Sequence, residues 1–160
     1  MLTATLSVAM AAVFLMGAQA DKPPGGEDGR ATIVDSGSTN RAGFRIAVDR
    51  SGNAEVTPQL RRFGQDTPPV PIRKTLPGAL VETFYANLKT AGRLDSLPAV
   101  HCAKSASFGS TLTVEFGNEK SPDLSCGDGS NPALRGLIEV VRQIVTLAGV
   151  QDMRLKRQVR

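Results

Sequence analysis

Apolar residues in this chain recur with two different periods, and the order of these periods limits the folds that the chain can adopt. Every second residue is apolar in 44–48 and 112–116, which is typical of strands with one buried face. Apolar residues recur at every third or fourth position in 80–88 and 134–148, which is typical of amphipathic helices. Strands and helices that alternate in this way predict a two-layer α+β domain, in which two helices pack on antiparallel strands.

The strand-like segments predict a meander over 31–57 and a hairpin over 111–125. Turn residues such as Asp49-Arg50-Ser51-Gly52-Asn53 separate the strands of the meander. The hairpin is expected to turn at Gly117-Asn118, and Pro122 interrupts its return strand, Glu119–Ser125. The predicted strands of the meander are Ala31–Val34, Phe44–Val48 and Ala54–Thr57.

Each helix has residues that mark its two ends. Pro77 fits the first turn of the first helix, and Gly92 is expected to end it. In the second helix Asn131 is the expected N-cap before Pro132, and Gly149 marks the end.

The first twenty residues are typical of a cleaved signal peptide. Met1–Ala20 contain no charged side chain, Leu6–Met16 are almost wholly apolar, and Ala18-Gln19-Ala20 is a small-x-small cleavage signal. This apolar core is shorter than the about 20 residues that span a bilayer, so we expect no stable membrane anchor. The sequence therefore predicts a periplasmic or secreted protein; a buried N-terminal helix is the alternative interpretation.

Removal of the leader leaves about 140 residues, enough for one hydrophobic core. We expect a disordered spacer over 21–30 because of its Pro and Gly, a single domain over 31–150 and a basic tail over 151–160. Within the domain, 58–75 contains four prolines and is expected to be an exposed loop. The tail and this loop carry most of the positive charge, but the chain has no Trp and one Tyr, so a nucleic-acid partner is not expected.

The two cysteines, Cys102 and Cys126, are expected to form a disulfide in an oxidising compartment. A hairpin that turns at Gly117-Asn118 would set Cys126 opposite Gly109, seven residues from Cys102. The bridge should therefore connect two flanking loops and not neighbouring positions of the ladder. Free or redox-active thiols are the alternative.

One motif suggests catalysis. Ile33-Val34-Asp35-Ser36-Gly37-Ser38 resembles the active-site loop of aspartic proteases, and this resemblance implies that Asp35 is the catalytic carboxylate. A homodimer of the retroviral type would supply the second Asp. A strand that ends in Asp-Ser-Gly is also ordinary turn chemistry, and two strong helices disagree with a nearly all-β enzyme.

Other combinations of reactive residues are weaker. His101 and Cys102 are neighbours, and neighbours on an extended chain point to opposite faces, so they do not form a nucleophile–base pair. One His and two Cys are too few for a closed zinc site, and no cofactor motif is found. We therefore predict no metal and no cofactor.

The order of elements resembles that of the emfourin-like proteins, small bacterial inhibitors of thermolysin-like metalloproteases. The segments that carry the resemblance are a Ser- and Gly-rich first turn, Leu94-Asp95-Ser96-Leu97-Pro98, Leu112-Thr113-Val114-Glu115, and Asn131-Pro132-Ala133-Leu134-Arg135-Gly136-Leu137-Ile138. The resemblance covers 31–148 apart from the Pro-rich insert, and it implies an α+β fold and binding to a protease. The two cysteines and the leader depart from the family's pattern.

Three functional hypotheses follow. The first is an exported, non-enzymatic domain that binds an extracytoplasmic protein such as a protease. Its expected contact surface is the Pro-rich loop with Arg61, Arg62, Arg73 and Lys74, although a solvated linker would have the same composition. The second is an aspartic protease that uses Asp35, and the third is a purely structural envelope protein.

Overall fold

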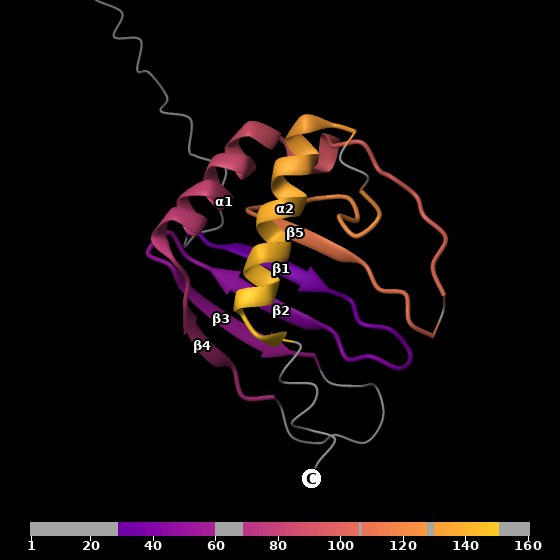
Figure 1. Cartoon of the computed structure of the whole chain (residues 1–160), viewed down its shortest axis with the longest axis horizontal. Helices are drawn as coiled ribbons and strands as arrows, with labels where there is room; N and C mark the ends of the chain where they lie inside the picture. The colour runs from indigo at the N-terminus through magenta and orange to yellow at the C-terminus, as the bar shows by residue number, and fades with distance from the viewer. Residues whose placement is uncertain (1–28, 60–68, 106, 128–129, 151–160) are drawn as a thin grey trace, which may run out of the picture.

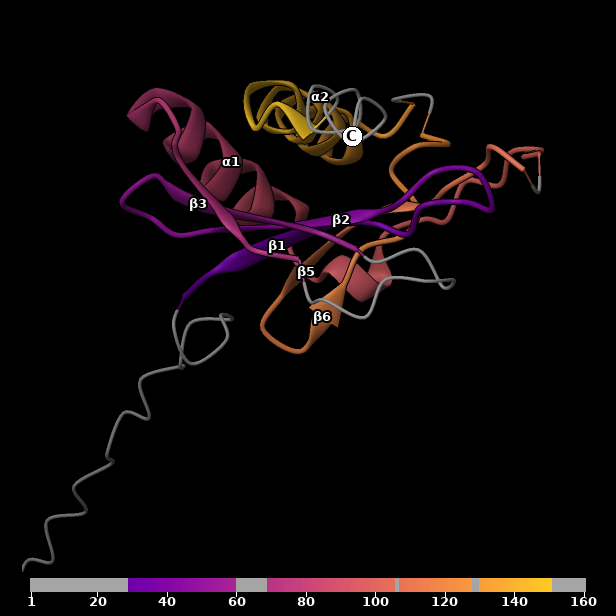
Figure 2. The same cartoon turned by 90° about the horizontal axis from the view of Figure 1, so that it is seen from below.

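The computed structural model describes residues 29–59, 69–105, 107–127 and 130–150. Here an antiparallel sheet has the strand order β4-β3-β2-β1-β5-β6, and helices α1 and α2 lie side by side on one of its faces (Figure 1 and Figure 2). This arrangement confirms the predicted α+β fold. The elements are β1 (Ala31–Asp35), β2 (Phe44–Val48), β3 (Asn53–Pro58), β4 (Ile72–Thr75), α1 (Gly78–Ala91), the short 3₁₀ helix η1 (Leu94–Ser96), β5 (Leu112–Phe116), β6 (Glu119–Lys120) and α2 (Pro132–Leu147).

The predicted meander and hairpin join in one sheet because β5 pairs with the free side of β1. Ile33 of β1 is opposite Ile46 of β2 and Val114 of β5, and Ile46 is in turn opposite Val56 of β3. These four side chains form a fully buried row across the sheet. Because alternate residues of a strand share a face, this row fixes which face carries the helices.

The helices cover that row with the apolar stripes expected from the sequence. Phe84 of α1 and Leu137 of α2 are fully buried in the same core as Ile33. The side chain of Asn131 accepts hydrogen bonds from the amides of Ala133 and Leu134 at 3.0 and 3.3 Å, which confirms the predicted N-cap of α2.

Two boundaries differ from the predictions. The segment 58–75 is not a loop throughout, because Ile72–Thr75 form β4, antiparallel to β3. All four residues of β4 are exposed, so the strand lacks the buried alternate positions that would have revealed it. The return strand of the hairpin is also shorter than predicted, with only Glu119–Lys120 in β6. Pro122 has no N–H to donate, which explains why the ladder stops there.

Several predicted segments lie outside the described residues, namely the signal peptide, 21–28 of the spacer, the basic tail, and 60–68 with Arg61 and Arg62. Within the described part, no helix combines the length and the apolar character that crossing a membrane requires.

Asp49 organises the turn between β2 and β3. Its Oδ1 accepts hydrogen bonds from the Ser51 hydroxyl at 2.6 Å and from the amides of Ser51 and Asn53 at 2.9 and 3.0 Å. The hydrogen bond from the Ser51 hydroxyl is the main reason that the pKa of Asp49 falls from 3.8 to about 2. Gly52 adopts a φ of +90° here, a conformation that a residue with a Cβ adopts only under strain.

Asp49→Asn is expected to destabilise the domain by about 1 kcal/mol at neutral pH, because it removes the charge from these hydrogen bonds. A carboxyl whose pKa is depressed in the folded state stabilises that state above the unfolded pKa, near 3.8. That stabilisation is lost as the pH falls through about 2, so the difference between variant and wild type should shrink in acid. Urea unfolding of both proteins at neutral and acid pH measures it. A difference that does not change with pH would contradict this role.

Candidate functional site

The Asp35 carboxylate lies at the end of β1, and the surrounding side chains engage both of its oxygens. Oδ1 accepts a hydrogen bond from the Gly37 amide at 2.8 Å, and Oδ2 accepts one from Nη2 of Arg41 at 2.7 Å. The Ser110 hydroxyl donates to Oδ2 at 3.4 Å and also contacts Nη2 of Arg41. The Asp35 side chain is 8% exposed and that of Arg41 is 33% exposed, so the ion pair is largely buried.

This arrangement bears on the protease hypothesis. A catalytic carboxylate of that class holds an attacking water and shares a proton with a second carboxyl group. Among the described residues, the partners that the structure gives the Asp35 carboxylate are an amide, a guanidinium and a hydroxyl. These contacts close the turn after β1, and they are typical of an ion pair that stabilises the fold.

The turn that Asp35 closes also packs against a distant loop, which the sequence did not indicate. The Ser36 amide donates to the Thr111 carbonyl at 2.9 Å, and the Thr111 amide donates to the Ser36 hydroxyl at 2.9 Å. The Ser38 hydroxyl donates to the Ser107 carbonyl at 2.9 Å. The serines of the motif therefore hold two loops together, and none of these hydroxyls is aligned with a base.

The Cys102–Cys126 disulfide is present and joins two segments outside the strands, as the sequence predicted. Lys104 contacts Asp123 close to the bridge, and its Nζ also donates to the Ser125 hydroxyl at 2.6 Å. Burial raises the pKa of the Asp123 carboxyl, but hydrogen bonds from Lys104, Ser125 and the Leu112 amide outweigh this, so the pKa lies below its usual range. An ion pair therefore supports the covalent link.

The lysine and serine in this cluster are close enough to be considered as a nucleophile and base. A Ser–Lys pair reacts only when the amine is neutral and can accept the hydroxyl proton. Here Nζ of Lys104 donates to the Ser125 hydroxyl and contacts the Asp123 carboxylate, so the lysine is placed as a hydrogen-bond donor and not as a base. His101 is exposed, and the described residues contain no group of His, Cys, Asp or Glu side chains that could hold a metal ion.

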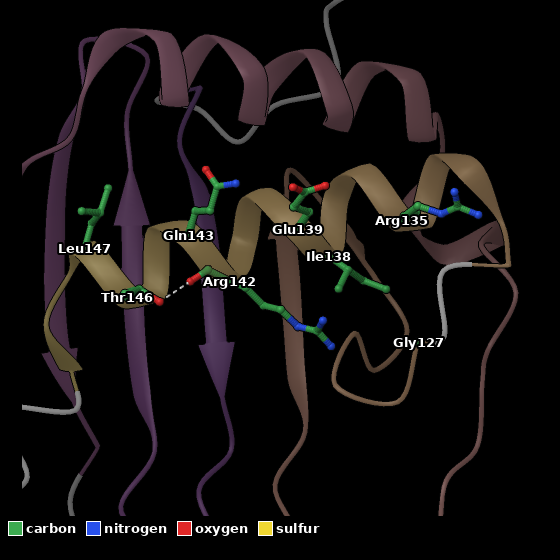
Figure 3. A pocket seen from close by; sticks show the side chains of 8 residues that line it. All are labelled: Gly127, Arg135, Ile138, Glu139, Arg142, Gln143, Thr146 and Leu147. Atoms are coloured by element: carbon green, nitrogen blue, oxygen red, sulfur yellow. Dashed lines mark hydrogen bonds between the residues drawn. The ribbon is translucent and has the colours of Figure 1, made fainter.

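A shallow hollow of about 650 Å³ lies on the outer side of α2. Ile138 and Arg142 extend from the helix toward the loop that carries Gly127, whereas Glu139 and Gln143 lie on the side of α1 (Figure 3). The loop approaches α2 so closely that a Cβ at Gly127 would overlap Ile138. One helix face supplies nearly all of this lining, and it contains no nucleophile with an adjacent base.

A second hollow, of about 660 Å³, lies beside α1. The Arg50 guanidinium sits 4.2 Å from the centroid of the Tyr85 ring. The Tyr85 hydroxyl donates to the Val48 carbonyl at 2.8 Å, and burial raises its pKa. Tyr85 therefore lines the hollow, and its hydroxyl group is engaged in a hydrogen bond that stabilises the fold.

The candidate contact residues separate into two groups. Arg73 and Lys74 are exposed on β4, at one edge of the sheet, whereas Arg61 and Arg62 lie outside the described residues. Neither Arg73 nor Lys74 forms an ion pair with any residue that the structure describes. Two apolar side chains, Val70 and Ile72, are exposed beside them, at 79% and 38%. This edge, 70–74, combines two cations that are outside the described ion pairs with exposed apolar surface.

The fold and these surfaces define a disulfide-bonded α+β domain with one basic sheet edge, which pairs with no further strand in the part of the chain that the structure describes. The chain matches no known family model, and it has no significant match among curated proteins.

Proposed function

We propose that this protein is an exported, non-enzymatic domain that binds a protein partner. The observation that carries the proposal is the edge 70–74, where two cations that form no ion pair with a described residue lie next to exposed apolar side chains. Protein interfaces favour arginine and apolar anchors of this kind. The ion pair between Asp35 and Arg41 also supports a non-enzymatic function. The aspartic protease hypothesis needs Asp35 to hold a water and share a proton, and here Arg41 binds that carboxylate.

Export is the second part of the proposal. It rests on the apolar, uncharged Met1–Ala20 and on a disulfide of the kind that persists in oxidising compartments. The partner is then an extracytoplasmic protein. In the version that the resemblance to emfourin-like proteins implies, that partner is a protease and the domain is its inhibitor.

A capture experiment tests this function. The chain is expressed with its leader, and the exported product is immobilised after mass spectrometry has shown an N-terminus at Asp21 and a closed disulfide. We expect the wild type to retain a specific envelope protein, and Arg73→Glu/Lys74→Glu to retain at least tenfold less of it. Lys89→Glu/Arg142→Glu is the matched control, because it makes the same change of charge on the two helices.

Three results would contradict the proposal. The wild type could retain no specific protein, or the exported product could keep its leader and its thiols. A peptidase activity of the wild type at acid pH that Asp35→Asn abolishes would favour the protease hypothesis instead.

A further inference from the structure

We infer that the open edge of β4 binds its partner by strand addition, and that the partner segment is extended and acidic. This inference rests on the proposed function and specifies the mode of binding. A strand at the edge of a sheet has a row of backbone groups with no neighbouring strand, and an extended peptide can pair with them. Among the described residues, β4 pairs with β3 alone.

The two edges of the sheet differ in how well they could accept another strand. β6 at the far edge has only two residues, and the Glu119 carboxylate accepts a hydrogen bond from the Leu94 amide of η1 at 2.8 Å. β4 has four residues, and all of them are exposed. A short, partly covered edge is one protection against strand addition, and charged side chains are another. β4 therefore has the more accessible backbone, and its two cations restrict the segments that it can accept to acidic ones.

The positions of the β4 side chains determine what the partner must offer. Ile72 and Lys74 are opposite Val56 and Ala54, which are buried under the helices, so they lie on the helix side of the sheet. Arg73 is opposite Glu55 and lies on the other side. An antiparallel partner would therefore place one acidic residue opposite Lys74, a second opposite Arg73, and an apolar residue opposite Ile72.

Charge makes a second copy of this chain a poor occupant. Two copies of Ile72–Thr75 can pair antiparallel in two kinds of register. If the symmetry axis lies between Arg73 and Lys74, each Arg73 is opposite the Lys74 of the other copy. If the axis passes through one of these residues, that cation is opposite the same cation of the other copy. Like charges directly opposite each other destabilise a strand pair, whereas opposite charges stabilise it. Pro71, which has no N–H, also ends the ladder at Ile72 and limits pairing with longer strands.

A titration with blocked peptides tests the inference on the full, oxidised protein. One peptide carries Glu-Glu-Val within a run of Thr and Val, and the other carries Lys-Lys-Val in its place. Backbone amide NMR shifts and hydrogen-exchange protection report where binding occurs. We expect saturable binding of the acidic peptide with new protection in Ile72–Thr75, and roughly tenfold weaker binding of the basic peptide.

Charge-reversal variants make the test specific. Arg73→Glu/Lys74→Glu should invert the preference, so that it binds the Lys-Lys-Val peptide at least as well as the wild type binds the acidic one. Lys89→Glu/Arg142→Glu should leave the preference unchanged. Far-ultraviolet circular dichroism and hydrogen exchange of the free variants verify that the sheet is intact.

Several outcomes would overturn the inference. These are no saturable binding of the acidic peptide, shifts centred on the hollow of α2, a preference that the β4 variant does not change, or self-association that requires β4. If the acidic peptide fails but the capture experiment retains a partner, strand addition is wrong and the proposed function stands. If the peptide binds at β4 but no partner is captured, strand addition at β4 stands and the proposed function fails.

Discussion

Replacing both Cys102 and Cys126 with Ser is expected to lower the free energy of unfolding by about 3.5 kcal/mol. The bridge joins residues that are 24 positions apart, and it restricts the unfolded chain more than the folded one. A domain of this size has a total stability of about 5–15 kcal/mol, so the loss is a large fraction of the whole. Guanidinium unfolding of wild type and variant under oxidising conditions measures the difference.

The wild type provides its own control for this measurement. Reduction with dithiothreitol should destabilise it to the level of the double Ser variant and should leave that variant unchanged. The ion pair of Lys104 with Asp123 lies beside the bridge and can keep the two loops together after reduction. A loss of unfolding free energy below about 1 kcal/mol would mean that non-covalent contacts already order these loops. The disulfide would then contribute little to the stability of the domain.

Asp35→Ala is the second change with a large expected effect, a destabilisation of about 2–4 kcal/mol. The variant leaves the Gly37 amide without its acceptor and Arg41 as an uncompensated, partly buried charge. Breaking one side of a buried ion pair costs more than the pair contributes, because the remaining charge stays away from water. Chemical unfolding measures the effect, and Asp35→Asn should cost less because its amide oxygen can still accept from Gly37.

The chain contains a matched control for the burial of this pair. Arg93 and Asp95 also approach to 2.7 Å, but their side chains are 72% and 47% exposed. Asp95→Ala is therefore expected to leave the free energy of unfolding nearly unchanged, because water screens an exposed ion pair. If the Asp35 and Asp95 variants lost equal amounts, burial would not be the reason for the importance of Asp35.

The sequence predicted most of the fold because the elements with a buried face have a clear periodicity. Phe44, Ile46 and Val48 alternate along β2, and α2 shows both its apolar stripe and its cap. β4 was missed for the opposite reason. Ile72–Thr75 bury no side chain, so their only signal is the neighbouring prolines, which favour a loop.

The candidate site was less predictable from sequence. The bridge between Cys102 and Cys126 follows from counting cysteines, but the Asp35–Arg41 pair depends on how the turn after β1 folds back. The contacts of Ser36 and Ser38 with the 107–111 segment join residues that are about 70 positions apart. No local pattern reports such contacts, and so the same serines could be interpreted as part of a catalytic motif.

The central position of β1 has a consequence for biogenesis. β1 is the first strand among the described residues, yet it needs β5, about 80 residues later, to complete its hydrogen bonds. During synthesis β1, β2 and β3 can assemble early, while the other side of β1 has no partner strand until Leu112–Phe116 emerge. Such long-range closure is slow, and an intermediate with a bare inner strand is prone to aggregate. The step that commits this protein to its native state therefore comes late, when the fifth strand arrives.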